Sequence, residues 1–213
     1  MRTITTLIAA CMLMASNVQA DGYQQAMTDA LVSFSKCKTV KDYTTVANTF
    51  KRISNAEKDE WLPLYYHAQC YILMGFRQSE GAEKQDAHLD EAQRSIDEML
   101  ALNDQESEVY ALQSLLHTAR LVIDPMNRGQ QMMAASGKAI EQALALNPEN
   151  PRAQYMLLSN EVGMAQFFGK DVTDYCERII ALYGNWDKLN ESPAFYPSWG
   201  KNEVAGLLEN CNQ

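Results

Sequence analysis

The sequence lacks most of the signatures by which enzymes and metalloproteins are identified. It contains no G-x-S-x-G nucleophile motif, no H-E-x-x-H zinc motif and no glycine-rich phosphate loop. It has only three histidines, His67, His88 and His117, and no C-x-x-C pair. These absences argue against a hydrolase, a zinc ribbon and a thioredoxin-like redox site. We therefore expect a protein that is not an enzyme, with no catalytic residue and no bound metal or other cofactor.

One histidine has a neighbour that could bind a metal with it. His67 and Cys70 are three residues apart, so on a helix they would lie one turn apart and offer two ligands. The same spacing also suits a partly buried histidine beside a core or disulfide cysteine. We favour this second interpretation.

The chain is also poor in positive charge. It has 18 Lys and Arg against 27 Asp and Glu, a net charge of −9. An acidic surface repels phosphate backbones and anionic lipids, so nucleic acid is excluded as an expected partner.

A secretory signal is predicted at residues 1–20. Arg2 precedes an apolar run, and "SNVQA" places small residues before a cleavage site after Ala20. Removal of this segment takes Arg2 with it and changes the net charge to −10. The stretch "IAAC" resembles a lipobox, and membrane attachment is expected only if Cys11 is lipidated. We favour a soluble product in the periplasm or outside the cell.

Four cysteines remain after this cleavage, an even number in an exported chain. Cys37 and Cys70 lie in neighbouring predicted elements, as do Cys176 and Cys211. We therefore predict one disulfide within each of these two pairs, although four free, buried thiols remain an alternative.

Almost the whole chain after Tyr23 has apolar residues at helical spacing. No comparable run alternates at period two, so the fold class is all-α. Pro148 ends one helix, Asn150 is a good N-cap, and Pro151 suits the first helical position of the next. The apolar faces fall within residues 26–34, 43–53, 64–72, 89–100, 109–119, 133–144, 156–167 and 172–182.

A period of 44 residues runs through these helices. "IDEMLALND" (96–104) and "IEQALALNP" (140–148) match at five of nine positions, and Tyr66 and Gln69 precede Tyr110 and Gln113 by the same 44 residues. A fixed period of this size indicates repeated units that bury their apolar faces against one another.

The segment "IEQALALNPENPRAQYMLL" (140–158) resembles a tetratricopeptide repeat, as does the start of "WLPLYYHA" around Trp61. The period of that family is 34, so this chain needs longer loops. The resemblance implies antiparallel helix pairs stacked as a right-handed solenoid over residues 21–184. Residues 185–213, with an aromatic loop and a short helix from about Asn202, would then cap it.

In tetratricopeptide repeats the first helix of each pair lines the surface that holds a partner. Tyr66 with Gln69, and Tyr110 with Gln113, are one turn apart and share a face. With Tyr155, one residue out of register, they are candidates for binding an extended peptide, unless the tyrosines pack between helices.

We accordingly expect an exported scaffold that binds a protein or peptide in a bacterial envelope. The alternative of another class is a periplasmic protein that binds a small molecule, a sugar or a metal through the C-terminal aromatic loop. That loop region contains Trp186, Phe195, Tyr196 and Trp199, which either stack on a ligand or cap the core. A third possibility is a lipid-anchored subunit of an assembly complex.

Overall fold

The computed structural model describes residues 22–77, 79 and 81–212. The expected signal segment and Cys11 lie outside this part of the chain. The described residues form an all-α fold without a strand. A first helix over 22–34 is followed by α2 (Val40–Ala56), α3 (Leu62–Gly75), α4 (Ala82–Leu102), α5 (Ser107–Ile123), α6 (Pro125–Leu146), α7 (Pro151–Phe167), α8 (Cys176–Leu189) and α9 (Lys201–Leu208). Short 3-10 turns occur at Thr173–Tyr175 and Glu209–Asn212.

The helix boundaries follow from local capping chemistry. The Asn150 side chain accepts hydrogen bonds from the backbone N–H groups of Arg152 and Ala153, and Pro151 occupies the first position of α7, as the sequence predicts. Asp124 caps α6 in the same way, with Pro125 next. Proline therefore both closes α5 and opens α6, which allows a sharp turn between two antiparallel helices.

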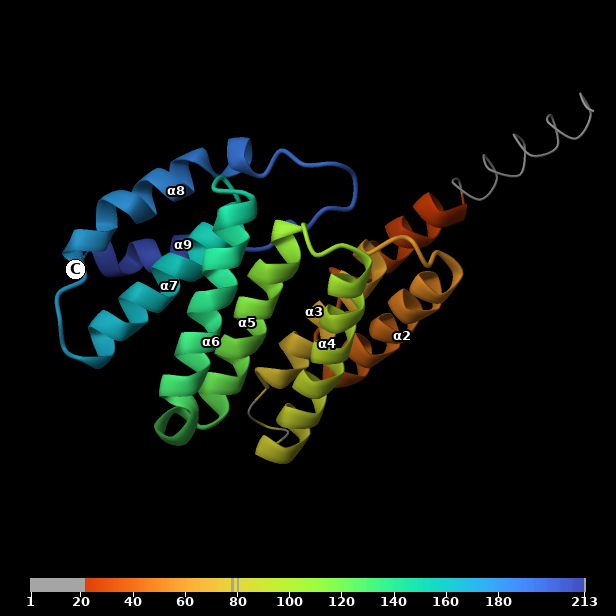
Figure 1. The fold of residues 1–213 in the computed structure, drawn as a ribbon, viewed down its shortest axis with the longest axis horizontal. Helices are drawn as coiled ribbons and strands as arrows, with labels where there is room; N and C mark the ends of the chain where they lie inside the picture. The colour runs from red at the N-terminus through yellow and green to blue at the C-terminus, as the bar shows by residue number, and fades with distance from the viewer. Residues whose placement is uncertain (1–21, 78, 80, 213) are drawn as a thin grey trace, which may run out of the picture.

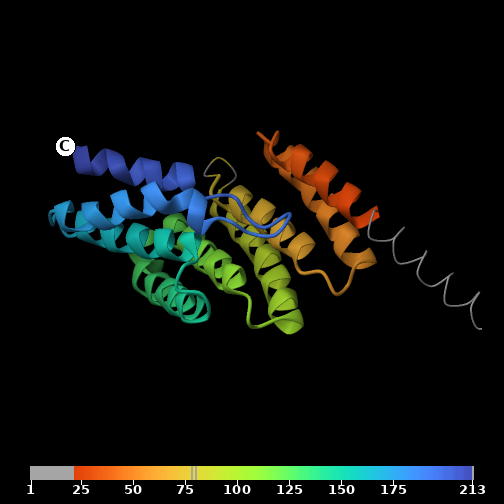
Figure 2. The ribbon, with the colours of Figure 1, turned by 90° about the horizontal axis from the view of Figure 1, so that it is seen from above.

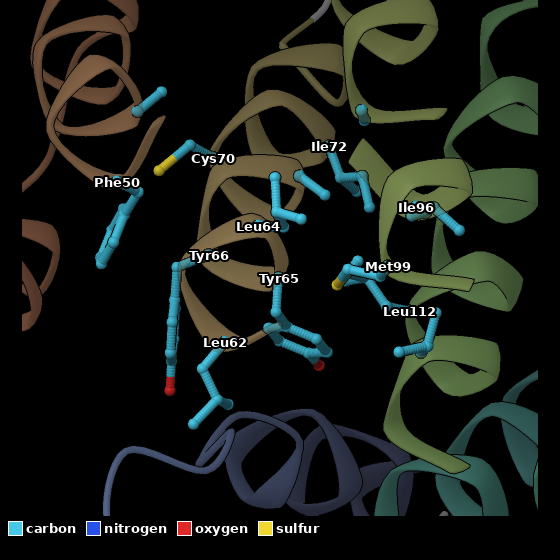
Figure 3. Packing of buried hydrophobic residues seen from close by; sticks show 14 of the residues in the cluster. Phe50, Leu62, Leu64, Tyr65, Tyr66, Cys70, Ile72, Ile96, Met99 and Leu112 are labelled. Atoms are coloured by element: carbon cyan, nitrogen blue, oxygen red, sulfur yellow. The ribbon is translucent and has the colours of Figure 1, made fainter. Parts of the chain in front are cut away.

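Consecutive helices pack antiparallel along the molecule, from the first helix to α8 (Figure 1). A large buried cluster joins the first helix to α2, α3, α4 and α5, and includes Phe50, Tyr65 and Leu112 (Figure 3). A second cluster joins α7, α8 and α9 around Trp186. The two ends of the chain therefore have separate cores, and a small cluster of alanines from α5, α6 and α7 lies apart from both.

The segment 190–200 between α8 and α9, which we call the strap, connects these two cores. It leaves the C-terminal helices and runs back toward the N-terminal half of the molecule (Figures 1 and 2). There, Phe195 and Tyr196 pack against the N-terminal cluster. The strap thus crosses the side of the molecule on which α3, α5 and α7 begin.

Two features of the predicted pattern are corrected by the structure. Met164 and Phe167 share the spacing of the core face of α7, yet they are 45% and 76% exposed. α8 continues to Leu189, beyond residue 184 where the repeats were expected to end. Within the described ranges, no helix has the length and apolar character needed to cross a membrane.

Candidate functional site

The strap is held in place by hydrogen bonds to two neighbouring tyrosines near the start of α3. The Tyr66 hydroxyl of α3 donates to the carbonyl oxygens of Phe195 at 2.8 Å and Tyr196 at 3.2 Å. The Trp199 indole N–H donates to the Tyr65 hydroxyl at 2.7 Å. Figure 3 shows Tyr66 directed from α3 toward the C-terminal ribbon. These bonds fix the strap although it contains no regular secondary structure.

Beyond these anchors the strap forms one wall of a cleft of about 600 Å³, which we call the aromatic cleft. Its other walls are the start of the first helix and the linker between α2 and α3. Such a volume is ordinary for a small-molecule site. The lining residues are Tyr23, Gln24, Glu57, Glu60, Trp61, Leu62, Pro193, Ala194, Phe195 and Tyr196.

The rings of the cleft pair edge to face. The Tyr23 and Phe195 ring centroids are 6.1 Å apart at 86°, and those of Trp61 and Tyr196 are 5.3 Å apart at 90°. Phe195 has a backbone φ of 66°. It is the one non-glycine residue with a positive φ among the described residues. A left-handed backbone at a bulky residue is strained, and such strain concentrates at functional sites. Here it places an aromatic ring in the cleft.

The cleft contains a buried hydroxyl group close to acidic side chains. The Tyr23 Oη atom is buried beside the Glu60 carboxylate, and no hydrogen bond of normal geometry satisfies it within the described chain. Burial raises the pKa of Tyr23, and the nearby carboxylates of Glu60 and Glu57 raise it further. A buried polar atom without a partner is rare and costs free energy. The group is therefore available to a ligand.

The opposite wall carries a second carboxylate contact. The Tyr196 hydroxyl donates to Glu106 Oε2 at 3.0 Å. Burial, and then Glu106, raise the pKa of Tyr196 to about 12. Both cleft tyrosines consequently remain neutral at physiological pH.

A second depression of about 470 Å³ lies between α7 and α8, and we call it the α7–α8 groove. Leucines form its floor, and Arg178 and Lys188 lie at its rim. Arg178 Nη1 is already bonded to Glu161 at 2.6 Å. The groove has no aromatic residue among those that line it. It is therefore the weaker candidate for stacking on a flat ligand.

Two of the five partner-binding candidates lie in the core. Tyr66 and Gln69 are each only 4% exposed, and the strap covers Tyr66. They share a face of α3, as predicted, but that face is not available to an extended peptide. The first pair of the expected ladder is therefore enclosed in this structure.

The remaining candidates are half-buried and have partners within the chain. The Tyr110 hydroxyl donates to the Asp104 carbonyl oxygen at 3.1 Å. The Gln113 amide bonds to Gln93 at 2.9 Å. Tyr155 belongs to the C-terminal cluster, and its ring lies 6.3 Å from that of Trp199. These three side chains help to join helices in this structure.

The cysteines divide into one bonded and one free pair. Cys176 and Cys211 form a disulfide, whereas Cys37 and Cys70 are free thiols. The disulfide is in keeping with an oxidising, extracytoplasmic location.

His67 Nδ1 is 2.7 Å from the Ser95 hydroxyl, so this ring nitrogen is engaged between helices. In the described ranges, no three His, Cys, Asp or Glu side chains gather to hold a metal ion.

The four aromatic residues of the C-terminal region have separate roles. Trp186 is buried, and Trp199 anchors the strap to Tyr65, so both stabilise the fold. Phe195 and Tyr196 line the cleft. The sequence pattern did not identify Tyr23, Trp61, Glu57 and Glu60 as site residues. The only available signal was the aromatic residue beside acidic residues in "EKDEW", which periodicity does not place in space.

No protein-family model matches the sequence, and no curated protein sequence matches it. Among solved structures, the chain is similar to the HusA haemophore from Porphyromonas gingivalis, with a TM-score of 0.76 and 28% identity. The match covers 89% of this chain and 92% of that one. A haemophore is a binding protein and not an enzyme, so the similarity favours the small-molecule alternative over the protein-binding scaffold.

Proposed function

We propose that this chain is an extracytoplasmic carrier that binds haem, or a closely related tetrapyrrole, in the aromatic cleft. The observation that carries the proposal is the similarity to a haemophore along nearly the full length of both chains. The cleft adds local support, because it has a suitable volume and aromatic walls on more than one side.

The side chains of the cleft fit the ring system of such a ligand. A tetrapyrrole is a flat, largely apolar macrocycle, and aromatic side chains stack on or abut such a face with a gain beyond simple burial. Trp61 and Tyr196 offer rings from two different elements, and Phe195 offers a third. The oxygen of Tyr23 is the buried polar group that a ligand would satisfy.

A titration with haemin, followed by its Soret absorption and by tryptophan fluorescence, tests the proposal. We expect saturable binding with a stoichiometry of one and quenching of Trp61, which lies in the cleft. Phe195→Gly is the most informative variant, because glycine accepts the positive φ while the ring is lost. It should weaken binding with only a small net loss of stability, because relief of the strained φ offsets part of the lost ring packing.

Two controls separate the cleft from other sites. Phe168→Ala removes an exposed ring at the end of α7 and should leave the affinity for haemin unchanged. Arg178→Gln with Lys188→Gln removes the cations of the α7–α8 groove. A loss of binding in this double variant, with none in Phe195→Gly, would move the site to the groove. Absence of saturable binding by the wild-type protein would refute the proposed function.

We also propose that the antiparallel helices stack as a right-handed, tetratricopeptide-like solenoid. The 44-residue period supports this, because Glu108 and Arg152, 44 residues apart, are both the second residue of their helices and contact each other. The strap and α9 would then be the capping element. A small-angle scattering profile of the purified protein should fit this elongated arrangement.

A further inference from the structure

The charged residues that line the aromatic cleft are all acidic. Two of its lining residues, Glu57 and Glu60, are acidic, and none of them is a lysine or arginine. Both belong to the linker between α2 and α3, which also contains Asp59. Lys58 is the one cation of this linker, and its exposed side chain does not line the cleft.

The wall formed by the strap adds to this negative field. Glu106 lies behind Tyr196 and accepts its hydroxyl hydrogen bond. The pKa of Tyr23 is raised in part by Glu60 and Glu57, and that of Tyr196 in part by Glu106. Both shifts mean that an additional negative charge in the cleft is disfavoured. The chain as a whole, with a net charge of −9, reinforces the effect at longer range.

This charge matters for tetrapyrroles because they differ mainly in their carboxylates. The ring is apolar, while the number and placement of carboxylates around its edge vary from one class to another. A carboxylate that enters beside Glu60 loses hydration and meets a like charge. A carboxylate at an edge that remains in solvent is screened by water and salt.

We infer that Glu57 and Glu60 make the cleft selective for tetrapyrroles that carry few carboxylates, all on one edge, and that the ligand enters with its uncharged edge first. The inference rests on the proposed function, since it concerns the same cleft. A ring with carboxylates on every side cannot enter without placing one beside the acidic linker. Rings of that kind are therefore rejected by charge as well as by size.

Affinities for a series of iron-free porphyrins test the selectivity. Protoporphyrin IX carries two carboxylates on one edge, coproporphyrin carries four and uroporphyrin eight, distributed around the ring. At low ionic strength we expect the affinity to fall along this series by roughly 15- to 35-fold for each carboxylate forced into the cleft, as for two like charges about 8–10 Å apart at an effective dielectric constant of about 20. The differences should shrink at high ionic strength.

Charge and size are separated by substitution. The double variant Glu57→Gln with Glu60→Gln keeps the shape of the cleft and should narrow the spread of affinities between the two- and four-carboxylate porphyrins. Glu141→Gln with Glu177→Gln removes the same charge from exposed positions on α6 and α8, which contribute no lining residue, and should leave the spread unchanged.

The possible results distinguish a failure of the charge selectivity from a failure of tetrapyrrole binding. Equal affinities for the two- and four-carboxylate porphyrins, or a spread that persists in the Glu57/Glu60 variant, would overturn the selectivity while leaving tetrapyrrole binding intact. A failure of every porphyrin and of haemin to bind would overturn the proposed function, and this inference with it.

Discussion

Arg152 and Glu108 form a buried, two-point ion pair between α7 and α5. Arg152 Nε lies 2.5 Å from Glu108 Oε2, and Arg152 Nη2 lies 2.7 Å from Glu108 Oε1. The side chains are 1% and 6% exposed. Arg152 also donates to Asn190 at the start of the strap, at 2.6 Å. The pair therefore fixes the position of the strap relative to two helices, and through it one wall of the aromatic cleft.

Breaking this pair should destabilise the protein strongly. Arg152→Met leaves the Glu108 carboxylate buried without a partner, and such changes cost about 3–5 kcal/mol. Urea denaturation monitored by circular dichroism measures the loss. The double variant Glu108→Leu with Arg152→Met removes both charges, and it should recover most of the stability. Equal stability of the single variant and the wild type would show that the pair contributes little.

The disulfide should stabilise the wall of the cleft. Cys176 and Cys211 are 35 residues apart, and the loop that they close contains the whole strap. For a loop of this length, the restriction of the unfolded chain is worth about 4 kcal/mol. We expect Cys176→Ser with Cys211→Ser to lower the free energy of unfolding by up to this amount and to weaken haemin binding. Cys37→Ser, which affects a free thiol, is the control and should change neither quantity appreciably.

Gly200 should tolerate no side chain. Its φ is +115°, and a Cβ atom there would overlap the ring of the buried Trp186. Gly200→Ala therefore combines backbone strain with overpacking, and we expect a loss of about 2–4 kcal/mol in thermal or urea denaturation. Gly206→Ala is the matched control, because that glycine lies in α9 with open space around its Cα. It should be neutral or slightly stabilising. Similar effects of the two substitutions would contradict the packing of Gly200 on Trp186.

Stability should fall as the pH drops below about 6.5, in part because of His67. Burial lowers the pKa of this histidine to about 4, and its side chain is almost fully enclosed. The unfolded chain, with a histidine pKa of about 6.5, takes up a proton between these values while the folded protein does not. The stability contributed by the neutral ring is thus complete above pH 6.5 and is lost toward pH 4, by up to about 3 kcal/mol.

A comparison of the wild type with His67→Gln isolates this contribution from the titration of carboxylates. The variant should be less stable at neutral pH, because ring packing against Tyr71 is lost. Its stability should nevertheless depend less on pH between 6.5 and 4. Parallel stability curves for the two proteins across this range would contradict the depressed pKa.

The helices and their ends were predictable because they depend on nearby residues. The 3.6-residue spacing gave the all-α class, and Asn150 and Pro151 gave the start of α7, since the cap acts on backbone groups two and three residues away. The same spacing placed Tyr66 and Gln69 on one face of α3. It could not tell whether that face is open, because the strap that covers Tyr66 lies about 130 residues further along the chain.

What the sequence alone determined was therefore local: helix identity, helix boundaries and the sharing of faces. Only the tertiary structure brings the candidate site together. The aromatic cleft takes Tyr23 from the start of the first helix, Trp61 from a linker and Phe195 from an irregular strap, and of these only Tyr23 belongs to a helical pattern. Their meeting depends on the long-range hydrogen bonds of the strap and on the strained backbone of Phe195. Periodicity reports which side chains face the same way, whereas a site made from loops depends on which distant segments come to lie beside each other.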